Sequence, residues 1–592
     1  MTQRLSTLLL LMVLAVPARA WTYGDTLTVV WKPLPTLPAI VRPTDTLAVW
    51  ANAPSSATGW SASLRFGALT VPLAPAGGGF VASKSRWELG FVIPVGTPEE
   101  IYDLQLASDA TAADTSRHSV KVIPAFRTSY YFAQISDTHL PEHAFSDGGG
   151  FSTADTSGMA DFDTVIDDLN LIHPEFILHT GDLVNEGELE EYLGMYEMGR
   201  AKDMLSRLRD PVFVTSGNHD IGGWQPTPPP DGTSRKNWWR YFGWPYLGAP
   251  PPGEHHSQDY SFDYGLLHAI GMEAYINSGS YDHYMQPTWG AQSMTTEQMG
   301  WLAFEVAAVP PGHTKIAFFH YDFGGTLANG QPAPNFSQFS NPAALGLDGV
   351  LFGHNHGIAE ATPAQLAAHP FNLGIRSVID NRTFRIFRVN NGVITPGIMH
   401  RTTAAADSLT LALSGPNDGT RARLTANLVN RYGETWEHAR LVFNMVDDDS
   451  LYGVTGGTVV QTIRQGGAIN VYVDCVLPGN GALTVLTIAP TAPIASVGPP
   501  APARLALAPP SPNPFRFGAG ALRIRFALPQ AEPARIDLFD IGGRRLATLL
   551  DGPSPAGERS IEWSGTGAAP GVYLVRLTAG GSSLTRRVLV LR

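Results

Sequence analysis

Cysteine is almost absent from this sequence. Cys475 is the only one in 592 residues, so no intrachain disulfide can form and no thiolate cluster can build a closed structural zinc site. A chain of this length is far larger than one hydrophobic core usually organises. We therefore expect several domains, each held together by burial of its own apolar side chains.

Long hydrophobic runs are also missing. The apolar run from Leu8 to Val16 follows a short basic start at Arg4 and precedes the sequence Ala18-Arg19-Ala20. It is too short for a membrane anchor and has the pattern of a secretory signal peptide with a small-x-small cleavage site. We predict a signal peptide over residues 1–20, a secreted or cell-surface location, and no transmembrane segment in the mature chain.

An excess of positive charge is missing as well. The formal net charge is −12 at pH 7, which argues against nonspecific attraction to nucleic acid or to an anionic membrane. The charge is uneven, because residues 501–592 hold 12 arginines, no lysine and six acidic residues, a local charge of +6. The remainder then carries about −18, and this difference indicates a separate C-terminal module.

The sequence pattern changes several times along the chain. Short alternating stretches punctuated by turn residues predict β domains on both sides of a central α/β region, and a Pro/Ala-rich stretch predicts a linker. The predicted segments are a signal peptide (1–20), an N-terminal β-sandwich domain (21–127), an α/β domain (128–400), a β-rich domain (401–495), a Pro-rich linker (496–513) and a C-terminal Ig-like domain (514–592).

Within the α/β region, buried strand candidates alternate with helical ones. We expect strands at 130–136, 175–180, 211–216, 315–319 and 349–352, and helices at 159–172 and 188–208. Three acidic residues of the first helix, Asp163, Asp167 and Asp168, are expected to form a solvated face.

Polar, metal-competent side chains follow each of these strand candidates. Ligands in open α/β folds gather at the carboxyl ends of strands, so the side chains are expected to meet. A glycine precedes three of the sites, at Gly181, Gly217 and Gly353, where we expect it to permit a sharp turn. The groups that could bind metal are Asp137, His139, Asp182, Asn218, His320, His354 and His356.

These seven groups suit borderline or hard divalent metals. Two metals that share a bridging carboxylate would use all seven, and two ions roughly 3.5–4 Å apart can clamp the attacking and leaving oxygens of phosphoryl chemistry. The two histidines of "GHNH" (353–356) could then serve different ions. Mn, Fe, Zn and Co all fit the donor set, so two divalent ions of this group are the expected cofactor.

The blocks "DTH", "GDLVNEG", "GNHD", a single His after a strand, and "GHNH" occur in that order over residues 130–356. They resemble the calcineurin-like metallophosphoesterase family. The resemblance implies a central β-sandwich core of mixed sheets flanked by helices, with β-sandwich (Ig-like) domains expected before and after it. The implied roles are one metal on Asp137, His139 and His356, the other on Asn218, His320 and His354, a bridge by Asp182, catalysis by His219 in the second sphere, and orientation of His219 by Asp220.

One position departs from the purple acid phosphatase branch of that family. That branch has a metal-binding tyrosine three residues after the Asp of its G-D block, where this sequence has Asn185. A tyrosinate–iron centre is therefore not expected. The segments "ISDTHL" and "GDLVNEGE" are more similar to the bacterial branch of the family, which includes cyclic-nucleotide phosphodiesterases.

The C-terminal module contains "PSPNPF" (510–515), "ARIDLFDIGGRRLATLL" (534–550) and "APGVYLVRL" (569–577). These segments resemble the C-terminal sorting domain of the type IX secretion system and the related FlgD-like Ig fold. The resemblance implies the secretion machinery as a partner. An Ig-like spacer or carbohydrate-adhesion module would have a similar β composition.

The sequence thus predicts an exported dinuclear phosphoesterase that hydrolyses a phosphomonoester or phosphodiester, with a metal-bridging hydroxide as the nucleophile and His219 as stabiliser or proton donor. One alternative is a non-catalytic surface adhesin with a relic metal site. The other is a nuclease, against which the acidic catalytic region and the absence of a basic stripe both argue.

Overall fold

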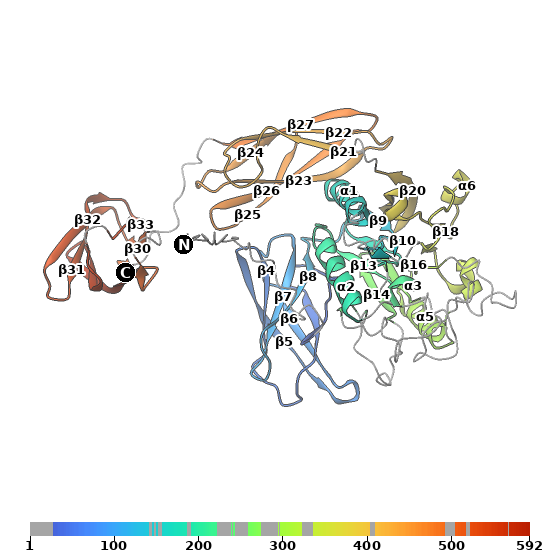
Figure 1. The fold of residues 1–592 in the computed structure, drawn as a ribbon, viewed down its shortest axis with the longest axis horizontal. Helices are drawn as coiled ribbons and strands as arrows, with labels where there is room; N and C mark the ends of the chain where they lie inside the picture. The colour runs from blue at the N-terminus through green and yellow to red at the C-terminus, as the bar shows by residue number, and fades with distance from the viewer. Residues whose placement is uncertain are drawn as a thin grey trace, which may run out of the picture. The chain divides into compact units, whose positions relative to one another are not determined.

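The sequence folds into two compact units, residues 1–490 and 491–592. The computed structural model describes residues 28–140, 145–146, 150–151, 157–185, 191–221, 238, 241–242, 258–273, 294, 296–321, 336–402, 409–491, 504–516, 521–565 and 568–591. The predicted signal peptide lies outside these residues. The prediction of a multidomain, sheet-rich chain is confirmed (Figure 1).

The N-terminal domain is built from eight strands in the order β1-β3-β6-β5-β4-β7-β8-β2. Strand β5 pairs with β4 through its first residues and with β6 through its last ones, so the two halves fold over one shared core. The strands are β1 (Val30–Lys32), β2 (Ala39–Val41), β3 (Thr46–Ala51), β4 (Ser61–Phe66), β5 (Leu69–Val81), β6 (Arg86–Val92), β7 (Glu100–Ala107) and β8 (Asp114–Val122).

Two five-stranded mixed sheets form the central domain. The first has the order β13-β12-β9-β19-β20 and the second the order β14-β15-β16-β17-β18. Strands β9, β12 and β13 are parallel, as are β15 to β18. The strands are β9 (Ser129–Ile135), β12 (Ile177–His179), β13 (Val212–Val214), β14 (Tyr260–Tyr264), β15 (Leu267–Gly271), β16 (Thr314–Phe318), β17 (Gly349–Phe352), β18 (Phe371–Gly374), β19 (Thr383–Asn390) and β20 (Val393–Arg401).

An aromatic core joins the two sheets face to face. Phe132 of β9 is fully buried and stacks on Phe176 and Phe387, with ring centroids 5.1 and 4.6 Å away. The same core takes Phe318 of β16 and Leu351 of β17 from the second sheet. Because both sheets bury one face here, their strands are fixed relative to each other, and so are the loops that leave the strand ends.

Helices cover the outer faces of this sandwich. Helices α1 (Ser157–Ile172) and α2 (Glu191–Leu205) pack on the first sheet, and α5 (Thr296–Ala308) packs on the second (Figure 1). Three short helices, α3 (Asn218–Ile221), α6 (Pro363–Leu366) and α7 (Val378–Asn381), lie in connections. The strand predictions are confirmed to within two residues at each end, and the helices predicted at 159–172 and 188–208 correspond to α1 and α2. A two-stranded hairpin comprises β10 (Phe145–Ser146) and β11 (Gly150–Phe151).

The next β domain continues the core of α1 and α2. Its two antiparallel sheets have the orders β21-β22-β27-β24 and β23-β26-β25, and one hydrophobic cluster runs from α1 into both. The strands are β21 (Leu409–Leu413), β22 (Leu424–Asn430), β23 (Trp436–Val446), β24 (Tyr452–Thr455), β25 (Thr458–Arg464), β26 (Ala468–Leu477) and β27 (Ala482–Pro490).

Asp168 on α1 corrects one expectation. It was expected on a solvated face, but its side chain is fully buried and accepts hydrogen bonds from the Tyr432 hydroxyl and from the Leu409 backbone N–H. The β domain covers this face of the helix, and a local helical pattern does not reveal such long-range coverage. Asp163, by contrast, is about half exposed and pairs with Arg207.

The second unit has its own core between sheets β28-β30-β33 and β29-β35-β34-β31-β32. Strand β28 falls within the range predicted as linker, yet it pairs with β30, and Leu507 is buried. Residues 504–513 therefore belong to the module. The strands are β28 (Ala506–Leu507), β29 (Phe515–Arg516), β30 (Leu522–Leu528), β31 (Glu532–Asp540), β32 (Arg545–Ser554), β33 (Gly557–Trp563), β34 (Gly571–Ala579) and β35 (Ser582–Leu591).

The stacked position of Phe132 predicts a large stability effect. Phe132→Ala removes a fully buried ring and should destabilise the first unit by about 3–5 kcal/mol, because both the apolar contact and the filled volume are lost. Phe304→Ala on α5 is the control, since that ring is 70% exposed. Chemical-denaturant unfolding followed by aromatic fluorescence measures both, and equal effects of the two substitutions would contradict the placement of Phe132.

Candidate metal centre

The candidate ligands come from loops at the carboxyl ends of five strands. Strand β9 leads to Asp137 and His139, β12 to Asp182, and β13 to Asn218 at the start of α3. Strand β16 leads to His320, and β17 leads to His354 and His356. The first three strands belong to one sheet and the last two to the other, so the centre lies where the ends of both sheets meet.

Ligand atoms of these residues gather in three overlapping groups, each with all its atoms within 4.8 Å of one another. Each group holds carboxylate and imidazole donors, and Asp182 is common to two of them. The groups are Asp137 with His139 and His356, His139 with Asp182 and His219, and Asp182 with His320 and His354.

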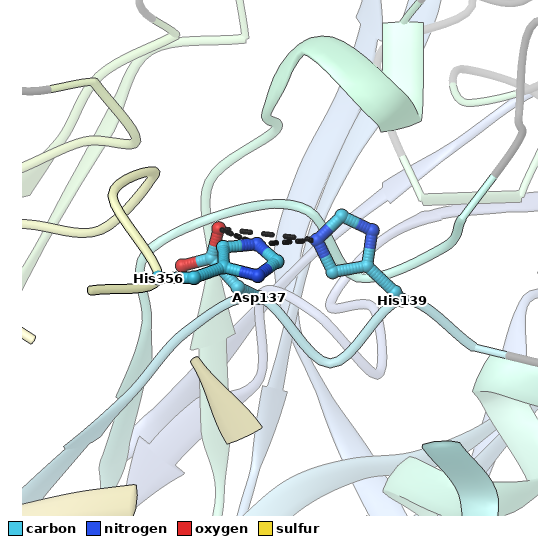
Figure 2. A group of neighbouring side chains, drawn as sticks. All are labelled: Asp137, His139 and His356. Atoms are coloured by element: carbon cyan, nitrogen blue, oxygen red, sulfur yellow. Dashed lines mark hydrogen bonds and ion pairs between the residues drawn. The ribbon is translucent and has the colours of Figure 1, made fainter. Parts of the chain in front are cut away.

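The first group brings two imidazoles to one carboxylate. The Nε2 atoms of His139 and His356 are 3.1 Å apart, and His356 Nε2 is 3.4 Å from Asp137 Oδ1. Figure 2 shows the ring nitrogen of His139 facing both other side chains. The two ring nitrogens and the carboxylate oxygen thus converge on one place, an arrangement that suits a shared cation.

The third group brings His320 and His354 to Asp182. His320 Nε2 lies 2.9 Å from Asp182 Oδ2, and His354 Nδ1 lies 3.2 Å from His320 Nε2. The other ring nitrogen of His320, Nδ1, is 2.8 Å from the backbone carbonyl oxygen of Thr180. A proton on Nδ1 that donates to this carbonyl leaves Nε2 free as a ligand atom.

Asn218 lies between Gly217 and His219, both of which approach Asp182. Its neighbour His219 donates its backbone N–H to Asp182 Oδ1 over 2.9 Å. The amide oxygen of Asn218 is buried and has no hydrogen-bond partner, and Asp137 Oδ1 is buried in the same condition. Buried oxygens normally find a partner, so two such atoms at one place fit ligands of cations.

Four of the candidate ligands have left-handed backbone conformations. Asp137, His139, Asp182 and His354 have φ values of 53°, 45°, 52° and 71°. Each such residue costs on the order of 1–3 kcal/mol unless it can be accommodated locally, and strained residues concentrate at functional sites. The turns after the strands are therefore made largely by the ligand residues themselves.

The three glycines next to the ligands serve two different purposes. Gly181 has φ of 92°, as expected for a sharp turn, whereas Gly217 and Gly353 do not have positive φ values. A Cβ at Gly217 would overlap Asp182 Oδ1 and lie 2.5 Å from the Asp182 backbone nitrogen. A Cβ at Gly353 would overlap the Ser136 hydroxyl and lie 2.7 Å from Asp137 Oδ2. These two glycines make room for carboxylates.

The imidazoles at the centre differ in charge. Burial and the neighbouring His219 lower the pKa of His139 to about 4, and burial with His320 lowers the pKa of His354 to about 4. Both rings are then neutral at pH 7 and carry a lone pair for a metal. For His320, burial lowers the pKa, but the carboxylate of Asp182 outweighs it and raises the pKa to about 9.

Both central carboxylates are ionised despite their burial. Burial raises the pKa of Asp137 and Asp182, but the histidines overcome it and hold both pKa values below the usual range, chiefly His356 for Asp137 and His320 for Asp182. Two ionised carboxylates, the neutral imidazoles of His139 and His354 and an amide oxygen are a donor set for hard or borderline divalent ions. The residues present therefore fit a two-metal cofactor.

His219 and Asp220 follow Asn218 on α3. His219 Nδ1 hydrogen-bonds to the backbone carbonyl of Asn185, and the carboxylate of Asp220 accepts backbone N–H groups of Gly217, Leu183 and Val184. Burial, with the charge of Asp182, raises the pKa of Asp220 to about 7. Through these contacts Asp220 holds the backbone of the two loops that carry Asp182 and Asn218. The prediction that Asp220 orients the His219 ring stays a prediction.

Sequence reasoning missed two residues that contact the ligand histidines. Asn185 Oδ1 is 3.0 Å from His139 Nδ1, and Asp380 of α7 pairs with His356 Nδ1. Asn185 lies inside a motif block and could have been found there. Asp380 lies 24 residues after His356, and no local pattern connects the two.

Residues 130–357 match the family model described as Calcineurin-like phosphoesterase. No curated protein matches the sequence. Among solved structures, the purple acid phosphatase PPD1 from yellow lupin (Lupinus luteus) seeds aligns at 10% identity and a TM-score of 0.36, over 65% of this chain and 70% of that chain. A dimetal phosphatase from Danio rerio aligns at 12% identity and a TM-score of 0.31, over 47% of this chain and 98% of that chain.

The family match and the ligand groups together define the class. The protein is a metallophosphoesterase, a hydrolase that acts on phosphate ester bonds, and its catalytic domain contains residues 130–357. Two divalent metal ions are its cofactor.

The close approach at Gly217 gives a test of this geometry. Gly217→Ala must displace Asp182, because the new methyl group would overlap both its carboxylate and its backbone, so the variant should lose metal affinity by at least about tenfold. Gly357→Ala is the matched control, with its nearest neighbour 3.8 Å from the new Cβ. Elemental analysis after dialysis measures the metal, and circular dichroism checks folding. Full metal retention in folded Gly217→Ala would contradict the described packing.

Proposed function

We propose that the protein is an exported enzyme that hydrolyses a phosphomonoester or phosphodiester at a two-ion centre made by seven residues. Asp137, His139 and His356 would hold one ion, and Asn218, His320 and His354 would hold the other. Asp182 would be the carboxylate that the two sites share. The observation that carries this assignment is the sharing of ligand residues between neighbouring groups, with Asp182 in two of them.

Each residue of this centre has a defined task. When bound, two divalent ions supply Lewis-acid stabilisation of charge on the phosphoryl oxygens and activation of water at neutral pH. The chain holds Asp182 ionised between its two groups of histidines, so that ligand charge is concentrated at one carboxylate. His139 and His354 offer neutral nitrogens, which do not have to lose a proton before they bind.

His219 is the group we assign to proton transfer. Its Nδ1 hydrogen-bonds to the Asn185 carbonyl, and we assign to its Nε2 the stabilisation of the phosphoryl group or the protonation of the leaving oxygen. The ring of His219 lies edge to face with that of His139, with centroids 4.6 Å apart, which keeps it next to the ligand groups. Asp220 supports this arrangement through the backbone of the same loops.

A direct assay tests the activity. The purified full chain, stripped with chelator and reloaded with Mn²⁺, Fe²⁺, Zn²⁺ or Co²⁺, should hydrolyse a chromogenic phosphomonoester or phosphodiester only when metal is restored. Asp182→Asn, in which the shared carboxylate loses its charge, should lose metal and activity together. Full metal content with normal turnover in that variant would exclude the assigned two-ion centre.

His219→Ala separates catalysis from metal binding. The variant should retain both ions and lose about 10²–10⁴-fold in kcat, the usual contribution of a general acid–base group. Elemental analysis and steady-state kinetics measure the two quantities on the same sample. Loss of metal, or an unchanged kcat, would contradict the role.

Export is the second part of the proposal. It is supported by the N-terminal sequence of residues 1–20 and by the likeness of residues 514–592 to sorting modules. No helix in the described part of the chain is long and apolar enough to cross a membrane. In this proposal the C-terminal unit delivers the enzyme and takes no part in hydrolysis.

Truncation after Pro490 tests whether hydrolysis and export depend on different units of the chain. Residues 491–592 form a separate unit with their own core, so the shortened enzyme should keep its kcat/KM. In a host with type IX secretion machinery, the shortened form should accumulate in the periplasm while the full chain reaches the surface or medium. Unchanged surface delivery would sink the sorting role, and lost activity would show that the module supports catalysis.

A further inference from the structure

The histidines of the two proposed ions are held in different ways. In the group of Asp137, the rings of His139 and His356 have side-chain partners, the carboxamide of Asn185 and the carboxylate of Asp380. In the group of Asp182, His320 has a backbone partner, the carbonyl of Thr180. Only one of these three partners, Asp380, carries a full negative charge.

A negative partner changes what an imidazole can do for a metal. A proton on Nδ1 that is held by a carboxylate fixes the tautomer and the ring orientation, and it makes the opposite nitrogen a stronger donor. His356 Nε2 is the atom that faces Asp137 and His139, so the effect of Asp380 reaches this group directly. The pair is accessible, with 58% of the Asp380 side chain and 36% of the His356 side chain exposed, so Asp380 can be removed without leaving a buried charge.

The placement of Asp380 depends on the same turns that carry the ligands. The first residues of α7, Val378 and Ile379, donate backbone N–H groups to the carbonyls of Ser136 and Asp137 over 2.9 and 3.1 Å. Asn381 Nδ2 donates to the backbone carbonyl of His356 over 3.0 Å. Helix α7 thus connects the Asp137 turn to the His356 loop, although it lies beyond residue 357, where the family match ends.

We propose that Asp380 is a positioning residue that acts through His356. It selectively strengthens the binding of one ion, at the site of Asp137, His139 and His356. This inference rests on the proposed ligand assignment. The other ion, on Asn218, His320 and His354, has no carboxylate behind its histidines among the contacts that the structure gives for the described residues. Removal of Asp380 should therefore weaken the site of Asp137, His139 and His356 and leave the other site unchanged.

Calorimetric titration of the chelator-stripped full chain with Mn²⁺ tests the proposal. Wild-type protein should bind two ions. Asp380→Ala should weaken one of them about 10–100-fold, the usual effect of losing such a partner, and should leave the other within about threefold. Asp380→Asn, which keeps a neutral acceptor at this position, should fall between Asp380→Ala and wild type.

Two further variants show whether Asp380 acts through His356. His356→Ala should weaken the same single site, and Asp380→Ala added to it should have almost no further effect, since the two form one unit. The matched control is Asp263→Ala, which removes a similarly exposed carboxylate, paired with His268 at 2.8 Å on β14 and β15. It should leave both affinities unchanged.

The outcomes separate this inference from the function on which it depends. Three outcomes would overturn the positioning role but leave the two-ion centre standing, provided that the wild-type protein binds two ions. Asp380→Ala could leave both affinities unchanged, it could weaken both affinities equally, or its effect could add to that of His356→Ala. Fewer than two ions in the wild-type protein would overturn the ligand assignment itself, and this inference with it.

Discussion

Two ionised carboxylates buried side by side are the constraint on which this structure depends. Asp137 and Asp182 have 0% and 2% exposed side chains and share one small region with five imidazoles. Burial of like charges is costly unless cations balance them. The buried amide oxygen of Asn218 without a hydrogen bond, the ligand residues in left-handed conformations and the glycines that leave space for carboxylate oxygens all follow from a site built around positive charge.

The scaffold satisfies this constraint by rigidity. Two sheets packed on an aromatic core hold five strand ends in register, so that short turns are enough to bring the ligands together. The flanking β domains are tied to the central one by buried polar contacts within the first unit. Lys121 pairs with Asp210 at 3.2 Å and Tyr432 donates to Asp168, while Arg440 pairs with Glu99 at 2.5 Å and joins the two flanking domains to each other. These domains therefore extend the catalytic fold.

Much of the fold, and the strand ends at which the candidate ligands lie, could be predicted because both are local properties of the sequence. A run such as "GVLF" followed by Gly353 and two histidines contains the strand, its end and the donor atoms in eight residues. Asp380 and the burial of Asp168 could not be predicted in this way, since each depends on the approach of segments far apart in the chain. The sequence predicted a sharp turn at Gly181, Gly217 and Gly353, but only Gly181 has a positive φ. At Gly217 and Gly353 glycine is needed because a Cβ would overlap neighbouring atoms. The sequence alone does not distinguish these two reasons for a glycine.

Anomalous diffraction at the manganese edge, from crystals of the full chain grown with Mn²⁺, tests the central claim most directly. The account predicts two peaks roughly 3.5–4 Å apart, both in bonding distance of the Asp182 carboxylate, one beside His356 and the other beside His320. A single peak, or two peaks that do not share Asp182, would contradict it.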